Sequence, residues 1–263
     1  MPTVTINGNA VFYSEFGDPS LPPLVLLHGL YGDSTGVESL ALLLDRFHVI
    51  APDALGHGRS ARPVDFTLED QGRMLCGLVQ ELELPNAVLV GVSMGSYLAQ
   101  QAAILEPSTW SSLILIVSKA HGQTSSVAAY AKRMGFDLTT AAPEDMLAFM
   151  AGAVWSPDTS QDRRNEIMTG MSSDAIMLGP DEQAAVERSL RGFDLRPQLP
   201  SVTTPTLVIS GLADGLNPPE SGEEVASHIP NSRFEIYQHS GHMLTAEEPE
   251  RLVSDINQFV FVG

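Results

Sequence analysis

The segment that most constrains the fold of this chain is Gly91-Val92-Ser93-Met94-Gly95, a G-x-S-x-G motif. It follows an apolar run at residues 87–90, of the kind found in a strand that is buried on both faces. A stretch rich in helix formers, residues 96–104, comes after it and ends before Pro107. A serine between a strand and a helix must occupy a very tight turn, and glycine on either side removes the Cβ atoms that would clash there. The motif therefore predicts a strand–turn–helix unit that lifts the Ser93 hydroxyl out of a sheet.

Short apolar runs alternate with helical patterns along much of the chain, which predicts a mostly parallel α/β sheet with helices on both faces. An Asn7-Gly8-Asn9 hairpin signal joins the first two runs, and Thr67 with Asp70 has the spacing of a capping box. The expected strands are residues 4–6, 10–16, 24–27, 48–51, 87–90, 112–117, 206–210 and 234–237. The expected helices are residues 39–44, 67–82, 96–104, 220–228 and 247–262.

Between residues 118 and 197 the alternation gives way to helical patterns, with breaks at Gly135, Pro143, Pro157 and Gly179-Pro180. We expect two parts: a core made of residues 1–117 and 198–263, and a helical insertion of residues 118–197.

Four candidate functional residues, Leu30, Ser93, Asp214 and His242, follow predicted strands. In parallel sheets functional groups gather at the carboxyl ends of the strands. A serine hydroxyl needs a base to become a nucleophile, histidine suits neutral pH, and a carboxylate on its other nitrogen orients it. These residues therefore predict a Ser93–Asp214–His242 triad, with His239 as the alternative base three residues before His242.

These motifs resemble those of the α/β-hydrolase superfamily, and in particular its small, cap-bearing serine esterases and lactonases. The resemblance covers nearly the whole chain and rests on residues 28–30, 53–60, 91–95, 211–214 and 240–242. It implies an α/β-hydrolase fold in which residues 118–197 form a cap, and it favours His242 over His239. It also implies that the backbone amides of Leu30 and Met94 form the oxyanion hole. Serine at position 93 argues against relatives that use aspartate there, and Ser118 leaves the alternative position of the acid empty.

The resemblance implies a serine hydrolase of carboxylic esters or lactones with small to medium acyl groups. Carbon–carbon bond hydrolysis, a lyase reaction and acyl transfer use the same triad in relatives and stay open, as does a non-catalytic ligand receptor. Three residues of the insertion are candidates for the substrate pocket, each with a structural alternative. Trp155 either lines the pocket or anchors the cap, Met150 either contacts substrate or fills the cap core, and His121 either faces the site or lies in a solvated hinge.

The composition limits the partners of the chain. With 14 basic and 32 acidic side chains the net charge is −18, which disfavours nucleic acid and anionic membranes. Cys76 is the only cysteine, so no internal disulfide can form. No signal peptide, membrane span or compact metal-binding spacing is visible, and we expect a cytoplasmic protein without metal or cofactor. His28 is expected to support the oxyanion loop, and His57 to be an ordinary loop residue.

Overall fold

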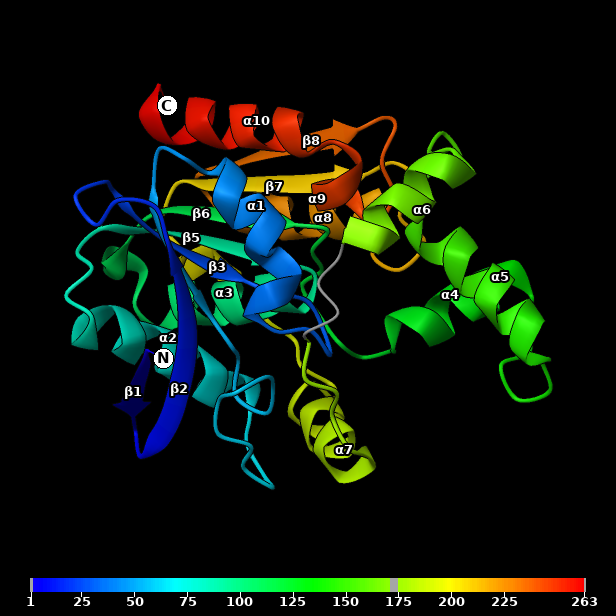
Figure 1. Cartoon of the computed structure of the whole chain (residues 1–263), viewed down its shortest axis with the longest axis horizontal. Coiled ribbons are helices and arrows are strands. Elements are labelled where there is room, and N and C mark those ends of the chain that lie inside the picture. Colours follow the sequence, from blue (N-terminus) through cyan, green and yellow to red (C-terminus); the bar gives the residue numbers. More distant parts are fainter. Residues whose placement is uncertain (1, 171–174, 263) are drawn as a thin grey trace.

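The computed structural model describes residues 2–170 and 175–262. Within these ranges eight strands form a sheet in the order β1-β2-β4-β3-β5-β6-β7-β8 (Figure 1). The pairs β1–β2 and β2–β4 are antiparallel and the other pairs are parallel. The strands are β1 (Thr3–Ile6), β2 (Asn9–Phe16), β3 (Pro23–Leu27), β4 (His48–Pro52), β5 (Ala87–Val92), β6 (Trp110–Ile116), β7 (Thr206–Gly211) and β8 (Ser232–Tyr237). The mostly parallel sheet predicted from the sequence is confirmed.

Helices cover both faces of the sheet, because alternate side chains of the buried strands point to opposite sides. On β3, Val25 and Leu27 belong to one apolar cluster, whereas Leu24 and Leu26 belong to the other. The first cluster is completed by α2 (Leu68–Glu81), α3 (Met94–Leu105) and α8 (Pro219–His228), and the second by α1 (Glu38–Leu43) and α10 (Pro249–Phe261).

Local signals set two of the helix boundaries. Thr67 and Asp70 form the expected capping box at the start of α2, with Thr67 N donating to Asp70 Oδ2 at 2.8 Å and Asp70 N to Thr67 Oγ1 at 3.1 Å. The terminal helix begins at Pro249 and not at residue 247, because the short helix α9 (Leu244–Glu247) ends first. Glu248 lies between them with φ −131°, and a residue before proline is disfavoured in the helical conformation.

The region 118–197 contributes helices and no strand to the described part of the sheet. Its helices are α4 (Ser126–Met134), α5 (Pro143–Val154), α6 (Gln161–Gly170) and α7 (Pro180–Ser189). Gly135 ends α4 in the left-handed conformation, and Pro143 and Pro180 begin helices, as proline can at a first turn. Figure 1 shows α4, α5 and α6 grouped beyond one end of the sheet, while α7 lies apart from them.

A short stem joins this region to the rest of the chain. His121 pairs with Asp194 in an isolated antiparallel bridge. Gly122 N donates to Phe193 O at 2.8 Å, and Leu195 N donates to Ala120 O at 2.9 Å. The two ends of the helical region therefore leave the core side by side.

None of the helices in the two described ranges combines the length and apolar character needed to cross a membrane.

Candidate active site

Ser93 lies in a strained turn between β5 and α3. Its backbone has φ 53° and ψ −117°, a conformation that side-chain-bearing residues rarely adopt. A Cβ atom on Gly91 would overlap the carbonyl of Gly95, and one on Gly95 would lie 2.7 Å from His28 O. Both glycines are therefore required for the turn, as their positions in the motif predict.

The structure brings Ser93, Asp214 and His242 together from three loops. His242 Nδ1 lies 2.8 Å from Asp214 Oδ2, and His242 Nε2 lies 2.9 Å from Ser93 Oγ. With the Nδ1 proton directed at the carboxylate, Nε2 is left to accept the proton of the serine hydroxyl. Ser93, His242 and Asp214 thus form one continuous chain of hydrogen bonds.

The Asp214 carboxylate is held in place by its own turn. Its side chain is fully buried, and its other oxygen, Oδ1, accepts hydrogen bonds from Leu216 N at 2.8 Å and Asn217 N at 2.9 Å. The geometry lets Asp214 act both as a turn aspartate and as a partner for histidine. The carboxylate is held in one orientation because Oδ2 contacts His242 while Oδ1 accepts the two backbone hydrogen bonds.

His239, the alternative base, lies elsewhere. Its Nδ1 is 2.6 Å from Asp158 Oδ2 on the loop after α5, and its side chain is 72% exposed. The Asp214 carboxylate contacts His242, whose side chain is only 12% exposed. Of the two histidines, His242 is the one placed to exchange a proton with Ser93.

The loop after β3 lies against the Ser93 turn. A Cβ atom on Gly29 would lie 3.6 Å from Ser93 Cβ. The buried His28 ring braces this loop, with Nδ1 2.8 Å from Gly29 O and Nε2 3.1 Å from Ala54 N. Burial lowers the pKa of His28, so that a neutral ring donates at Nδ1 and accepts at Nε2. This geometry matches the supporting role expected for His28.

Two amides next to the turn retain donor capacity. Within the described residues neither Leu30 N nor Met94 N donates a hydrogen bond to another group. Met94 is the first residue of α3, where helix amides lack intrahelical partners and the helix dipole favours negative charge. These amides are the ones expected to bind an oxyanion.

The loop after β4 is hydrogen-bonded to the loop that follows β3. The Asp53 carboxylate accepts hydrogen bonds from Ser34 N and Arg59 N, both at 2.7 Å. His57 is fully buried, and its ring centroid lies 5.2 Å from that of His28. Burial lowers the pKa of His57 to about 4. His57 is thus a neutral packing residue of this loop.

Two site residues have no counterpart among the predicted ones. Asn217 Nδ2 donates to Tyr97 OH at 2.8 Å and to Val117 O at 2.7 Å, which fixes the turn that orients Asp214. Burial raises the pKa of Tyr97, so its phenol stays protonated. Both residues follow predicted site residues closely in sequence. A tyrosine in a helix and an asparagine in a turn are nevertheless so common that neither is a signal by itself.

The three pocket candidates lie in different places. Trp155 is buried at the end of α5, and its backbone packs against Gly241, since a Cβ atom there would lie 2.9 Å from Trp155 C. Met150 is half-buried within α5. His121 is in the stem, where its Nε2 lies 3.7 Å from Glu224 Oε2 of α8. Its ring therefore lies next to α8, on the core.

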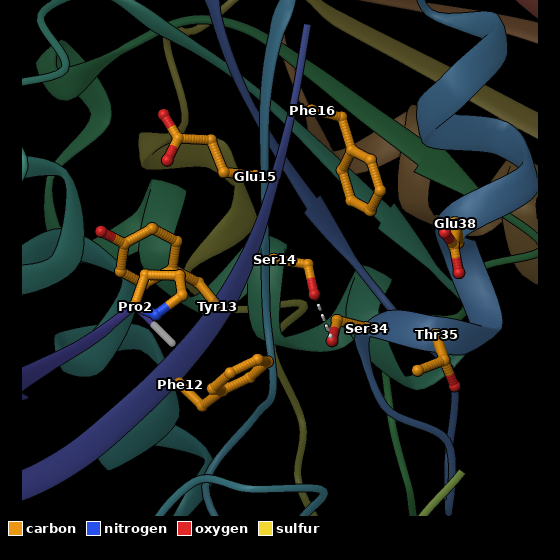
Figure 2. A pocket seen from close by; sticks show the side chains of 9 residues that line it. All are labelled: Pro2, Phe12, Tyr13, Ser14, Glu15, Phe16, Ser34, Thr35 and Glu38. Atoms are coloured by element: carbon orange, nitrogen blue, oxygen red, sulfur yellow. Dashed lines mark hydrogen bonds between the residues drawn. The ribbon is translucent and has the colours of Figure 1, made fainter. Parts of the chain in front are cut away.

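A separate groove of about 410 Å³ lies between β2 and the turn before α1 (Figure 2). Its lining includes Phe12 and Phe16 from β2, and Ser14 and Ser34 meet across it at 3.0 Å. None of its lining residues is a predicted site residue, and the lining includes no histidine or cysteine. The groove has no nucleophile–base pair and is distinct from the Ser93 site.

Over residues 2–170 and 175–262, no three His, Cys, Asp or Glu side chains gather in a way that could hold a metal ion.

Comparison with known proteins places this chain in a family. A family model described as the alpha/beta hydrolase fold matches residues 22–249. A 3-oxoadipate enol-lactonase of Acinetobacter baylyi is 28% identical over 251 residues, which cover 94% of this chain and 92% of the relative.

Solved structures agree over nearly the full length. A thermophilic esterase from Thermogutta terrifontis is 28% identical, with a TM-score of 0.76 over 99% of this chain and 98% of that one. An enol-lactonase from Burkholderia xenovorans has a TM-score of 0.81 at 24% identity, over 98% and 99% of the two chains, and this second likeness is one of fold.

Proposed function

The chain belongs to the α/β-hydrolase family, and we propose that it is a serine hydrolase of carboxylic esters or lactones with small to medium acyl groups. The observation that carries the proposal is the unbroken contact from Ser93 Oγ through the His242 ring to Asp214, at 2.9 Å and 2.8 Å. The lactonase and esterase names of the relatives support esters and lactones as the substrate class.

The proposed reaction is acyl transfer through a covalent intermediate. His242 Nε2 removes the proton of Ser93 as Oγ attacks the carbonyl carbon, and Asp214 stabilises the imidazolium that forms. His242 then gives this proton to the leaving alkoxide oxygen, which departs as the alcohol while Ser93 stays acylated. Water, deprotonated by His242, attacks the acyl carbon and releases the acid and the serine hydroxyl.

The negative charge on the carbonyl oxygen would be bound by the amides of Leu30 and Met94. They flank the nucleophile from the His28 loop and from the N-terminus of α3. One such donor is typically worth about 3 kcal/mol of transition-state stabilisation.

We further propose that the helices of residues 118–197 act as a cap and restrict the acyl group. In this arrangement Met150, on α5, and Trp155, directly after α5, are the residues that we propose line the pocket. The position of His121 in the stem favours its structural alternative.

The test is turnover of p-nitrophenyl acetate and butyrate, together with labelling by a fluorophosphonate. Ser93→Ala should abolish labelling and lower kcat by roughly 10⁵-fold, since the nucleophile is lost. Ser111→Ala, at an exposed position of β6, is the matched control and should behave like the wild type. Full activity in Ser93→Ala would refute the proposal.

A panel of esters, lactones and activated ketones with product analysis separates the related reactions. Ser93-dependent cleavage of a carbon–carbon bond, with no ester turnover, would show that the protein is a carbon–carbon bond hydrolase and not an esterase. Stoichiometric ligand binding without turnover would indicate a receptor.

A further inference from the structure

The end of α5 is bound directly to the loops that carry Asp214 and His242. Two backbone hydrogen bonds make the connection: Gly215 N donates to Ala153 O at 2.9 Å, and Met243 N donates to Val154 O at 3.1 Å. Each donor directly follows a member of the Ser93 hydrogen-bond chain. The helical insertion and these two loops therefore share backbone contacts at the site itself.

Glycines in both loops allow this close approach. A Cβ atom on Gly215 would lie 2.9 Å from Ala153 O, and one on Gly241 would lie 2.7 Å from Val154 O and 2.8 Å from Ser156 N. Real Cβ atoms do not come so near to backbone atoms, so only glycine fits without a shift. The contact is thus one of backbone against backbone, with little room to slide.

Glu247, in α9, completes the contact with its carboxylate. Oε2 accepts a hydrogen bond from Gly241 N at 2.6 Å. Oε1 accepts from Ser156 N at 2.8 Å and from Thr159 Oγ1 at 2.6 Å. Hydrogen bonds to a carboxylate are shorter and stronger than those between neutral groups.

The segment that contains Ser156 and Thr159 is itself held in place by hydrogen bonds. Arg164 of α6 donates to Thr159 O and to Ser156 O, both at 2.8 Å. Glu247 therefore joins an ordered turn of the insertion to the amide of the residue immediately before His242.

We propose that Glu247 is a positioning residue, which holds the His242 loop at the distance needed for proton transfer by tying it to the end of α5. The inference rests on the proposed function, because it concerns the base of that reaction. His242 must keep contact with Ser93 and Asp214 at once, and a displacement of about 1 Å at a reacting group can cost about 100-fold in rate.

The experiment compares Glu247→Gln with Glu250→Gln. The second variant removes the same charge at an exposed position three residues later, at the start of α10. Active sites are counted by fluorophosphonate titration, so that kcat is expressed per intact site. For Glu247→Gln we expect kcat for p-nitrophenyl acetate to fall by roughly 10- to 100-fold with a smaller change in KM. Glu250→Gln should match the wild type.

A second readout reports on His242 itself. Asp214 orients His242 and stabilises the imidazolium that forms during the reaction, so a loosened loop should change the pH profile of kcat/KM. It should also weaken or remove the downfield proton NMR signal of the Nδ1–H···Asp214 hydrogen bond. A role in folding alone would reduce the number of active sites and the melting temperature, but would leave both readouts unchanged.

Thr159→Val is the milder variant if Glu247→Gln does not fold. It removes one hydroxyl bond from Oε1 and leaves the carboxylate, so smaller changes in the same directions are expected. Wild-type kcat per site and an unchanged pH profile in the folded variant would overturn the proposal. If the wild-type protein has no Ser93-dependent turnover the proposed function fails, and the NMR signal still tests whether Glu247 orders His242.

Discussion

Residues 118–197 contact the rest of the chain at several places, and two of these attachments, at the end of α5 and at α7, differ in kind. At the end of α5 the contacts to the Asp214 and His242 loops are made by backbone atoms and a part-buried carboxylate. At α7 they are made by side chains: Ala185 and Val186 are buried in the apolar cluster of the core, and polar pairs lie nearer the surface. Tyr31 OH donates to Glu187 Oε1 at 2.6 Å, and Arg62 NH1 lies 2.7 Å from Glu182 Oε1.

The difference indicates which part of the site the fold holds rigid. Backbone contacts that only glycine permits allow a single arrangement of the two segments. The partners in an exposed side-chain pair, in contrast, readily exchange their hydrogen bond for one to water. Tyr31 directly follows Leu30, so α7 contacts the proposed oxyanion loop, whereas α5 contacts the residues directly after Asp214 and His242. We expect the acid–base side to be fixed and the oxyanion side to adjust to the substrate.

The largest effect should come from Gly241→Ala, which disrupts the backbone contact between the His242 loop and the end of α5. The added Cβ would lie under 3 Å from Val154 O, Ser156 N and Trp155 C, so either the loop or the end of α5 must move. We expect kcat/KM to fall by about 100-fold and the free energy of unfolding to drop by about 1–3 kcal/mol. Activity assays and thermal unfolding measure both.

Gly36→Ala is the control for this substitution, because a Cβ atom there would meet open space. It should change neither quantity. If Gly241→Ala kept both the activity and the stability of the wild type, the end of α5 would be no more fixed than α7.

A smaller effect is expected from Tyr31→Phe, which removes one hydrogen bond of the α7 attachment. An exposed bond of this kind contributes about 0.5–1 kcal/mol, which corresponds to roughly two- to fivefold in kcat/KM. A double-mutant cycle with Glu187→Gln isolates the pair, and its coupling energy should stay below about 1 kcal/mol. A coupling of several kcal/mol would show that α7 is bound as tightly as α5.

The sequence predicts the parts of the site that depend on local structure. The glycines around Ser93 predict the tight turn. The predicted ends of β5 and β7 place Ser93 and Asp214 at the same edge of the sheet. The choice between His239 and His242 is different, because both follow β8 and only packing decides which ring reaches Asp214. Only the family resemblance favours His242 over His239 at the level of the sequence.

The contacts of the insertion are harder to predict. Glu247 was expected inside the terminal helix, where a glutamate has no distinctive signal, and its partners Gly241, Ser156 and Thr159 belong to segments far apart in sequence. Tyr97 and Asn217 likewise gain their roles only when the loops are assembled. Tertiary packing, and no local pattern, determines which of many polar residues becomes a support for the site.

The smallest effect should come from Arg62→Gln, which breaks the ion pair with Glu182 at the base of α7. Both side chains are partly exposed, at 24% and 34%, and such pairs typically contribute about 0–1 kcal/mol. We expect the melting temperature to fall by no more than about 3 °C, with kcat unchanged. Adding salt should reduce the difference between wild type and variant, because exposed charges are screened. A loss as large as that of Gly241→Ala would mean that surface charge, and not backbone contact, holds the insertion in place, and the contrast between the two attachments would then disappear.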